Sequence, residues 1–140
     1  MKKINFPNLC IFVLTTALIS ISCNKNIDVP LSQELIGKWT MESAVGTYTI
    51  MGISQQDTTW FTSNDFVEFK NDGTLAIEKT DKKFDGKWKM ESNKLVITET
   101  DYIDYPGGFD ISRFTGTNLQ LYFAVKDSLT SLEHTLNFKK

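Results

Sequence analysis

The chain has 140 residues, with 15 basic and 17 acidic side chains and a formal net charge of −2. This length suits a single domain, and its 41% of hydrophobic and 23% of charged residues are typical of a globular chain rather than a disordered one. The acidic balance and the single arginine argue against a nucleic-acid partner, because nucleic-acid binding requires a basic face.

The first residues have the pattern of a secretory signal. Lys2 and Lys3 precede an apolar run from Leu9 to Ile21, as the basic and apolar regions of a signal peptide do. A membrane-spanning helix is the weaker alternative, because it needs about 20 apolar residues and this run is shorter. We therefore predict a signal peptide over residues 1–22.

The end of this run resembles a bacterial lipobox, with the sequence Ile-Ser-Ile-Ser before Cys23. The resemblance implies cleavage before Cys23 and attachment of acyl chains to its thiol and to the new N-terminus. An ordinary cleaved signal with a chance cysteine is the alternative. Several acyl chains make a stable anchor, so we expect residues 23–32 to tether the chain to the outer membrane of the cell envelope. The sequence leaves the periplasmic or surface face undecided.

Residues 33–140 have the alternating pattern of an all-β domain. No window after residue 37 contains a helical apolar stripe, and only residues 30–36 could form a helical turn. Apolar residues instead alternate with polar ones between short turn signals. The nine expected strands are Lys38–Val45, Thr47–Ser54, Asp65–Lys70, Thr74–Lys79, Phe84–Met90, Lys94–Thr100, Phe109–Thr115, Leu119–Val125 and Ser131–Phe138.

Most of these strands are separated by hairpin-length turns. Asn71-Asp72-Gly73 and Ser92-Asn93 are typical turn sequences, and Gly73 can adopt a positive φ. Sequential hairpins favour an up-and-down antiparallel barrel of about eight to nine strands, because closure removes the exposed edges. A β-sandwich is the alternative, since both folds share this alternation.

Several motifs in this order are similar to those of lipocalins. Gly37-Lys38-Trp39 resembles the Gly-x-Trp that opens the first lipocalin strand, and residues 66–75 resemble a hairpin of the small lipocalin-like lipoproteins of Bacteroidota. Gly86-Lys87-Trp88 and Leu95-Val96-Ile97 continue that pattern. The resemblance covers about residues 33–138 and implies a lipocalin-like barrel.

The resemblance also implies a role for Trp39, which would plug the closed end of the barrel with an arginine packed over it. Arg113 is the candidate because it is the single arginine, although the lipocalin arginine follows the last strand. Alternation places Arg113 on an apolar face, where it must pair, stack, lie at the rim or meet an anionic group of a ligand.

A lipocalin-like barrel implies binding of a small apolar or amphipathic molecule. In the first strand, Trp39, Met41 and Ser43 would share the inner face. Together with Arg113, the candidate ligand-binding residues are Met41, Phe69, Ile77, Trp88, Ile97, Ile111, Leu121 and Phe123.

The alternative is a non-enzymatic interaction or scaffold protein with a filled barrel, which would dock a protein partner in the envelope. An open pocket would favour the binding module, whereas a core filled by bulky side chains would favour the scaffold. The bulky inward positions point toward filling.

The sequence contains little that suggests an enzyme or a cofactor. His134 has Ser128, Ser131 and Asp127 nearby in sequence, but it alternates onto an apolar face, which predicts a histidine in the barrel interior or at its mouth. Lipidation of Cys23 would leave no free thiol in the mature chain. The carboxylates of Asp101 and Asp104 are more typical of a solvated turn than of an acid–base pair. A single histidine without a free cysteine does not suit a zinc site. We expect no catalytic residue, metal or cofactor.

Trp60 and Phe61 lie in an otherwise polar segment, residues 55–64, which reads as a linker. Two adjacent aromatics there suggest a lid or a partner contact, but the favoured interpretation is a loop that folds back and buries Trp60 on the end of the barrel.

Overall fold

The computed structural model describes residues 30–80, 82–102 and 108–140. The predicted signal peptide, Cys23 and Asp104 lie outside these residues. No helix within the described part is long and apolar enough to cross a membrane. The elements are α1 (Leu31–Leu35), β1 (Gly37–Ile50), β2 (Ile53–Trp60), β3 (Phe66–Phe69), β4 (Thr74–Lys79), β5 (Lys82–Glu91), β6 (Lys94–Thr98), β7 (Phe109–Phe114), β8 (Asn118–Lys126) and β9 (Thr130–Lys139).

The described strands form one antiparallel sheet that closes on itself. Its order is β2-β1-β3-β4-β5-β6-β7-β8-β9, and an additional pairing of β1 with β9 joins the ends. Eight strands therefore form a closed barrel, and β2 is an extra strand beside β1. The predicted antiparallel up-and-down barrel is confirmed, and the sandwich alternative is wrong.

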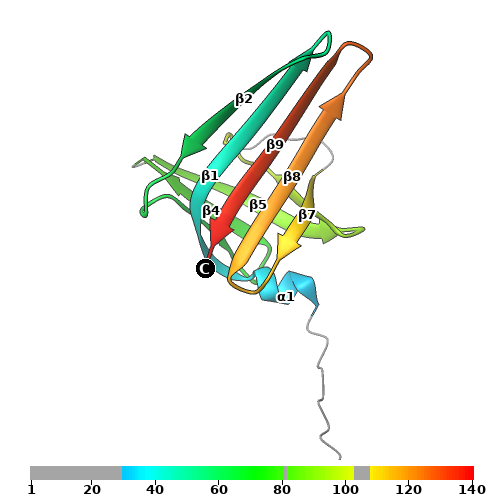
Figure 1. The fold of residues 1–140 in the computed structure, drawn as a ribbon. Helices are drawn as coiled ribbons and strands as arrows, with labels where there is room; N and C mark the ends of the chain where they lie inside the picture. Colours follow the sequence, from blue (N-terminus) through cyan, green and yellow to red (C-terminus); the bar gives the residue numbers. More distant parts are fainter. Residues whose placement is uncertain (1–29, 81, 103–107) are drawn as a thin grey trace, which may run out of the picture.

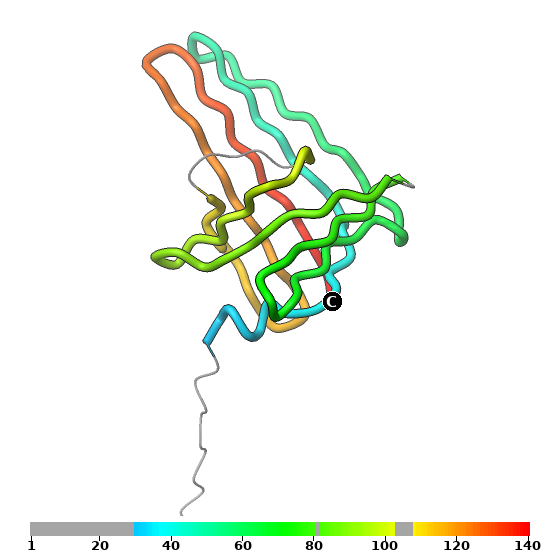
Figure 2. The backbone as a smooth tube through the Cα atoms, turned by 180° about the vertical axis from the view of Figure 1, so that it is seen from behind, coloured from blue at the N-terminus to red at the C-terminus, as the bar shows by residue number. Residues whose placement is uncertain are grey.

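β1 is long enough to pair with three strands (Figures 1 and 2). Gly37–Thr40 pairs with β3, whereas Ser43–Ile50 pairs with β2 on the same edge. Along its other edge, Thr40–Ile50 pairs with β9. The four strands β2, β1, β9 and β8 therefore continue beyond the rest of the barrel as a projecting sheet.

The first hairpin turns later than the sequence predicted. Met51 and Gly52 have φ values of 50° and 81°, as a two-residue hairpin turn of the primed type requires. Gly46, which we expected to end the first strand, lies inside β1 and faces His134 of β9. The predicted linker over residues 55–64 is therefore mostly strand β2, and the expected burial of Trp60 is wrong because 76% of its surface is exposed.

Two β-bulges change which side chains face inward. One lies between Met41 and Ser43, where the pairing of β1 with β9 shifts by one residue and moves Ser43 to the outer face. The other lies between Ile111 and Arg113 in β7. The prediction that Arg113 faces inward and stacks on the first-strand tryptophan is therefore wrong, and the guanidinium is exposed.

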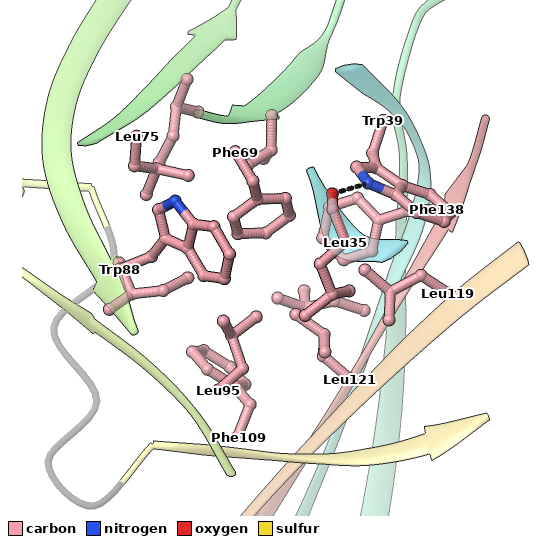
Figure 3. Close-up of a cluster of buried hydrophobic side chains, with 14 of the residues drawn as sticks. Leu35, Trp39, Phe69, Leu75, Trp88, Leu95, Phe109, Leu119, Leu121 and Phe138 are labelled. Carbon is pink, nitrogen blue, oxygen red and sulfur yellow. Dashed lines mark hydrogen bonds between the residues drawn. The ribbon is translucent and has the colours of Figure 1, made fainter. Parts of the chain in front are cut away.

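The barrel interior is a filled hydrophobic core (Figure 3). The rings of Phe69 and Trp88 meet edge to face, with centroids 5.3 Å apart, and the indole N–H of Trp88 donates to the carbonyl of Lys70. The buried hydrophobic residues are Leu35, Trp39, Met41, Val67, Phe69, Leu75, Ile77, Trp88, Leu95, Ile97, Phe109, Leu119, Leu121, Phe123, Leu136 and Phe138.

Trp39 lies at the end of the barrel beside α1. It is fully buried, and its Nε1–H donates to the carbonyl of Leu35 at 2.7 Å (Figure 3). The ring of Phe114 packs on it at 5.9 Å. A cation also covers this ring, but it is Lys140, which follows the last strand; its Nζ lies 5.0 Å from the ring centroid and donates to the carbonyls of Glu34 and Ile36.

The Trp39→Phe substitution should lower the stability of the protein. A phenyl ring at this position cannot donate to the Leu35 carbonyl, and an unsatisfied buried carbonyl together with the lost ring volume costs about 2 kcal/mol. Urea unfolding followed by circular dichroism measures this loss. The exposed Trp60→Phe is the matched control and should stay within about 0.5 kcal/mol of wild type. Equal stability of the two variants would show that the hydrogen bond does not hold this end together.

Candidate binding site at the open end of the barrel

The predicted ligand-binding residues mostly pack against one another. Met41, Phe69, Ile77, Trp88, Ile97, Leu121 and Phe123 are all buried, with at most 8% of their surface exposed. Ile111 is half-buried against the same core, and Arg113 lies on the opposite face of the sheet. The barrel therefore brings eight of the nine residues together, but as a packed core rather than as the lining of a deep cavity.

A smaller pocket lies where this core reaches the open end of the barrel. Its volume is about 180 Å³. Met41 is the one predicted ligand residue among its lining residues. This mouth pocket is lined by Met41, Ala44, Thr59, Phe61, Lys79, Tyr102, His134 and Leu136.

Beyond the mouth pocket, the inner face of the projecting sheet is largely apolar on β1, β8 and β9, whereas β2 adds the polar side chains of Asp57 and Gln55. Cross-strand pairing joins Leu136 and His134 in the pocket to Ala44 and Gly46 of β1, and the same face continues along each strand to its tip. We call this continuation the apolar wall. It consists of Tyr48, Ile50, Ile53, Val125 and Leu132.

The apolar wall is unusually open to solvent for such residues. Ile50 is 59% and Ile53 78% exposed. A groove of about 300 Å³ runs along Tyr48, Ile50, Met51, Ile53 and Gln55. Exposed apolar surface that continues out of a protein core commonly marks a ligand or partner site.

Lys79 places a positive charge at the mouth pocket. Its Nζ lies 4.9 Å from the ring centroid of Tyr102 and 5.3 Å from that of Phe61. These two rings hold the ammonium group by cation–π attraction. Within the described ranges, no carboxylate lies within ion-pairing distance of its ammonium group, although the Asp65 carboxylate interacts with it electrostatically at longer range.

Asp65 connects the two backbone segments on which Phe61 and Lys79 lie. Its buried carboxylate accepts hydrogen bonds from the backbone N–H and hydroxyl of Thr62 at 2.6 and 2.8 Å, and from the N–H of Thr80 at 2.7 Å. These bonds, those from the backbone of Thr62 first and of Thr80 next, hold the pKa of Asp65 below its ordinary value. They connect the segment after β2 to the end of β4, which keeps the two pocket side chains adjacent.

His134 faces the mouth pocket from β9, in agreement with its predicted place in the interior or at the mouth. Its ring meets Tyr48 edge to face at 6.0 Å, and burial lowers its pKa, which favours the neutral imidazole. Gly46 leaves room for this ring, because a Cβ there would lie 3.3 Å from Nε2.

The sequence neighbours of His134 do not form a catalytic triad with it. Asp127 accepts hydrogen bonds from the backbone of Leu129 and Thr130 and from the Thr130 hydroxyl, and so stabilises the turn between β8 and β9. Ser131 lies three residues from His134 and thus on the other face of β9. In the described part of the chain, no three metal-ligating His, Cys, Asp or Glu side chains come together.

Most residues of the mouth pocket are not apparent from the sequence, although one signal for them is present. Leu75 and Ile77 alternate onto the inner face of β4, and the same period of two reaches Lys79 at the end of the strand. The sequence favours Trp60 as the buried aromatic, whereas in the structure its neighbour Phe61 lines the pocket. Ala44 was hidden by the bulge, which alternation alone does not reveal.

Replacing Asp65 by Asn should remove acid sensitivity from the protein. A carboxyl with a lowered folded-state pKa adds stability above its unfolded pKa, and that stability is lost as the pH falls through the folded value. The difference in melting temperature between wild type and Asp65→Asn should therefore be large near neutral pH and shrink below about pH 4. Thermal unfolding across this range measures it, and a difference that does not change with pH would contradict the role of the carboxylate.

Comparison with known proteins gives one match. A sequence model described as a lipocalin-like domain matches residues 35–121. This span is more than half of the chain and runs from the last residue of α1 to the middle of β8. No curated protein and no solved structure matches the chain.

Proposed function

We propose that this chain, which belongs to the lipocalin-like domain family, binds one small amphipathic molecule at the open end of its barrel without catalysing a reaction. The observation that carries the proposal is the combination of an apolar wall with a positive charge at its base. Lys79 lies at the mouth pocket, and the apolar residues of the projecting sheet continue directly from it.

An amphipathic anion fits this arrangement. The acyl part would lie along the apolar wall, where burial of each methylene contributes about 0.8 kcal/mol. The anionic group would enter the mouth pocket and pair with the ammonium group of Lys79, which the rings of Phe61 and Tyr102 hold in place. The pocket of about 180 Å³ and the groove of about 300 Å³ together reach the size range of small-molecule sites.

The filled core is the reason for placing the ligand at the rim. Phe69, Trp88 and Phe123 occupy the space in which a lipocalin-like barrel would hold a ligand. A ligand inside the barrel would have to displace these side chains, whereas a ligand at the open end covers surface that is already exposed.

The location of the protein is part of the proposal. The signal and lipobox patterns support a chain held at the cell envelope by acyl chains on Cys23. The described residues begin at α1, at the opposite end of the barrel from the hairpin between β1 and β2 (Figure 1). An anchor on that side would direct the open end away from the membrane, toward the aqueous phase that supplies the ligand.

A second candidate function is supported by the same filled core. A scaffold protein of the envelope would use the apolar wall to dock another protein, because the wall exposes large side chains such as Ile53 and Val125. The two candidates differ in what occupies the wall.

Native mass spectrometry separates the two candidates. The protein would be expressed as residues 26–140, which contain all described strands and the core, and its native mass compared with the denatured mass. We expect an additional mass of one amphipathic molecule that is lost on denaturation. Identical masses, together with no binding of added dodecanoate, would favour the scaffold.

Lys79→Met should weaken binding of dodecanoate about tenfold, because one charge-assisted contact is lost. Binding of dodecanol, which has the same chain and no charge, should be unchanged. Lys83→Met is the matched control, since Lys83 is largely exposed on β5 and does not line the mouth pocket. Isothermal titration calorimetry measures the affinities of wild type and both variants for the two ligands, and equal effects of the two lysine variants would contradict the assigned role of Lys79.

Ala44→Phe should abolish binding of both dodecanoate and dodecanol, because a phenyl ring at this half-buried position fills the mouth pocket. Val45→Phe places the same ring on the opposite face of β1 and is the control. Unchanged binding by Ala44→Phe would show that the ligand does not use the mouth.

A further inference from the structure

A second surface, on the outer face of the barrel, carries a row of polar side chains that the proposed function does not use. Trp60 of β2 is paired with Ser43 of β1, Ser43 with Asn137 of β9, Asn137 with Gln120 of β8, and Gln120 with Arg113 of β7. Figure 1 looks onto these five neighbouring strands. Successive strands are about 4.8 Å apart, so the outer row is about 19 Å long.

The two β-bulges of the barrel create both halves of this outer row. The bulge between Met41 and Ser43 moves Ser43 outward, opposite Trp60. The bulge between Ile111 and Arg113 does the same for Arg113, opposite Gln120. Bulges of this kind re-aim side chains and are frequent beside functional sites.

Hydrogen bonds hold the middle of the outer row in one orientation. The amide of Asn137 donates to the hydroxyl of Ser43 at 3.0 Å, and the amide of Gln120 donates to the Asn137 oxygen at 2.9 Å. The hydroxyl of Ser112 donates to the Gln120 side-chain oxygen at 2.9 Å. Within the described residues, each of these two amides donates one of its two N–H groups to the network, so the second N–H of each is available to a ligand.

The ends of the outer row complete a broad binding surface. The indole of Trp60 is 76% exposed at one end. Arg113 is exposed at the other end, and within the described residues it has no carboxylate at ion-pairing distance. Both side chains line an open groove of about 530 Å³ that also includes Ser43, Gln120 and Asn137. Glu42 lines it as well, next to Ser43 in β1.

We propose that this outer row binds an acidic oligosaccharide. An exposed indole packs on the apolar face of a sugar ring, and oriented amides donate to and accept from sugar hydroxyls. The planar guanidinium of Arg113 suits a carboxylate through two parallel hydrogen bonds, so a uronic acid lies at that end. The length of the row fits several sugar units rather than one.

The chemistry of the row distinguishes this ligand from that of the open end. The amphipathic site combines an apolar wall with an ammonium group on the inner face, whereas the outer row offers fixed amides with a single aromatic ring. An extended peptide would pair with a strand edge, but Ser43, Asn137 and Gln120, the middle of the outer row, lie on strands whose two edges are both paired. Among the described strands, the free edge beside the row is that of β2, which carries Trp60.

Isothermal titration calorimetry on the full chain in phospholipid nanodiscs tests the outer row, with empty nanodiscs as the blank. The probes are hexagalacturonate, neutral maltohexaose and hexaglutamate, which carries the charge without the sugar. We expect hexagalacturonate to bind most tightly, maltohexaose more weakly and hexaglutamate not at all. Trp60→Ala should weaken hexagalacturonate binding at least tenfold, and Trp60→Phe should retain most of it because a phenyl ring also packs on a sugar.

Arg113→Gln should remove the preference for hexagalacturonate over maltohexaose and leave maltohexaose binding unchanged. Tyr48→Ala, an exposed aromatic on the inner face, and Lys83→Gln, an exposed cation on β5, are the controls and should bind as wild type does. Lys79→Met should also be without effect here, which separates this site from the open end.

Three results would overturn the proposal. Failure of both hexasaccharides to bind at millimolar concentration would remove the site. Binding that Trp60→Ala leaves unchanged would place the sugar elsewhere on the protein. Hexaglutamate binding as tight as that of hexagalacturonate would show that the surface responds to charge alone.

Discussion

The pairing of β1 determines both ends of this barrel. Over Gly37–Thr40 the strand pairs with β3 and closes the wall, whereas over Ser43–Ile50 it pairs with β2 instead. Because β9 follows β1 along the whole of Thr40–Ile50, the sheet does not stop where the closed barrel stops. The closed end therefore has Trp39 and α1 to seal it, and the other end has a single projecting wall that nothing within the described residues covers.

A filled interior moves the surfaces available for binding to the outside of the core. Large rings such as those of Phe69 and Trp88 pack against each other inside the barrel. Side chains packed as closely as in protein interiors leave no room for a ligand among them. What remains is the open end, where the inner face becomes exposed, and the outer face, where the bulges at Ser43 and Arg113 bring polar side chains into register. One small barrel thereby presents an apolar surface on the inner face of β2, β1, β9 and β8, and a polar surface on the outer face of these strands and β7.

Most of the fold could be predicted from the sequence because most of the strands alternate regularly between inner and outer side chains. Alternation predicted the inner positions of β4 and β8. Asn71-Asp72-Gly73 marked the turn between β3 and β4, where Gly73 has a φ of 80°. The candidate site was predicted less well. A bulge inserts one residue into a strand, and no particular residue type marks it in the sequence. The outward position of Arg113 could therefore not be predicted from alternation. The place of Gly46 inside a strand depends on His134, which is 88 positions further along the chain (134 − 46).

We propose that an amphipathic ligand meets this barrel at its open end and not in its interior. Methyl NMR spectra of residues 26–140, recorded with and without dodecanoate, test it most directly because leucine and isoleucine methyls sample both regions. We expect shifts at Ile50, Ile53, Leu132 and Leu136, which lie on the apolar wall and in the mouth pocket, and unchanged signals from the deep core residues Leu75 and Leu95. Shifts concentrated at Leu75 and Leu95, or none at the open end, would contradict the account.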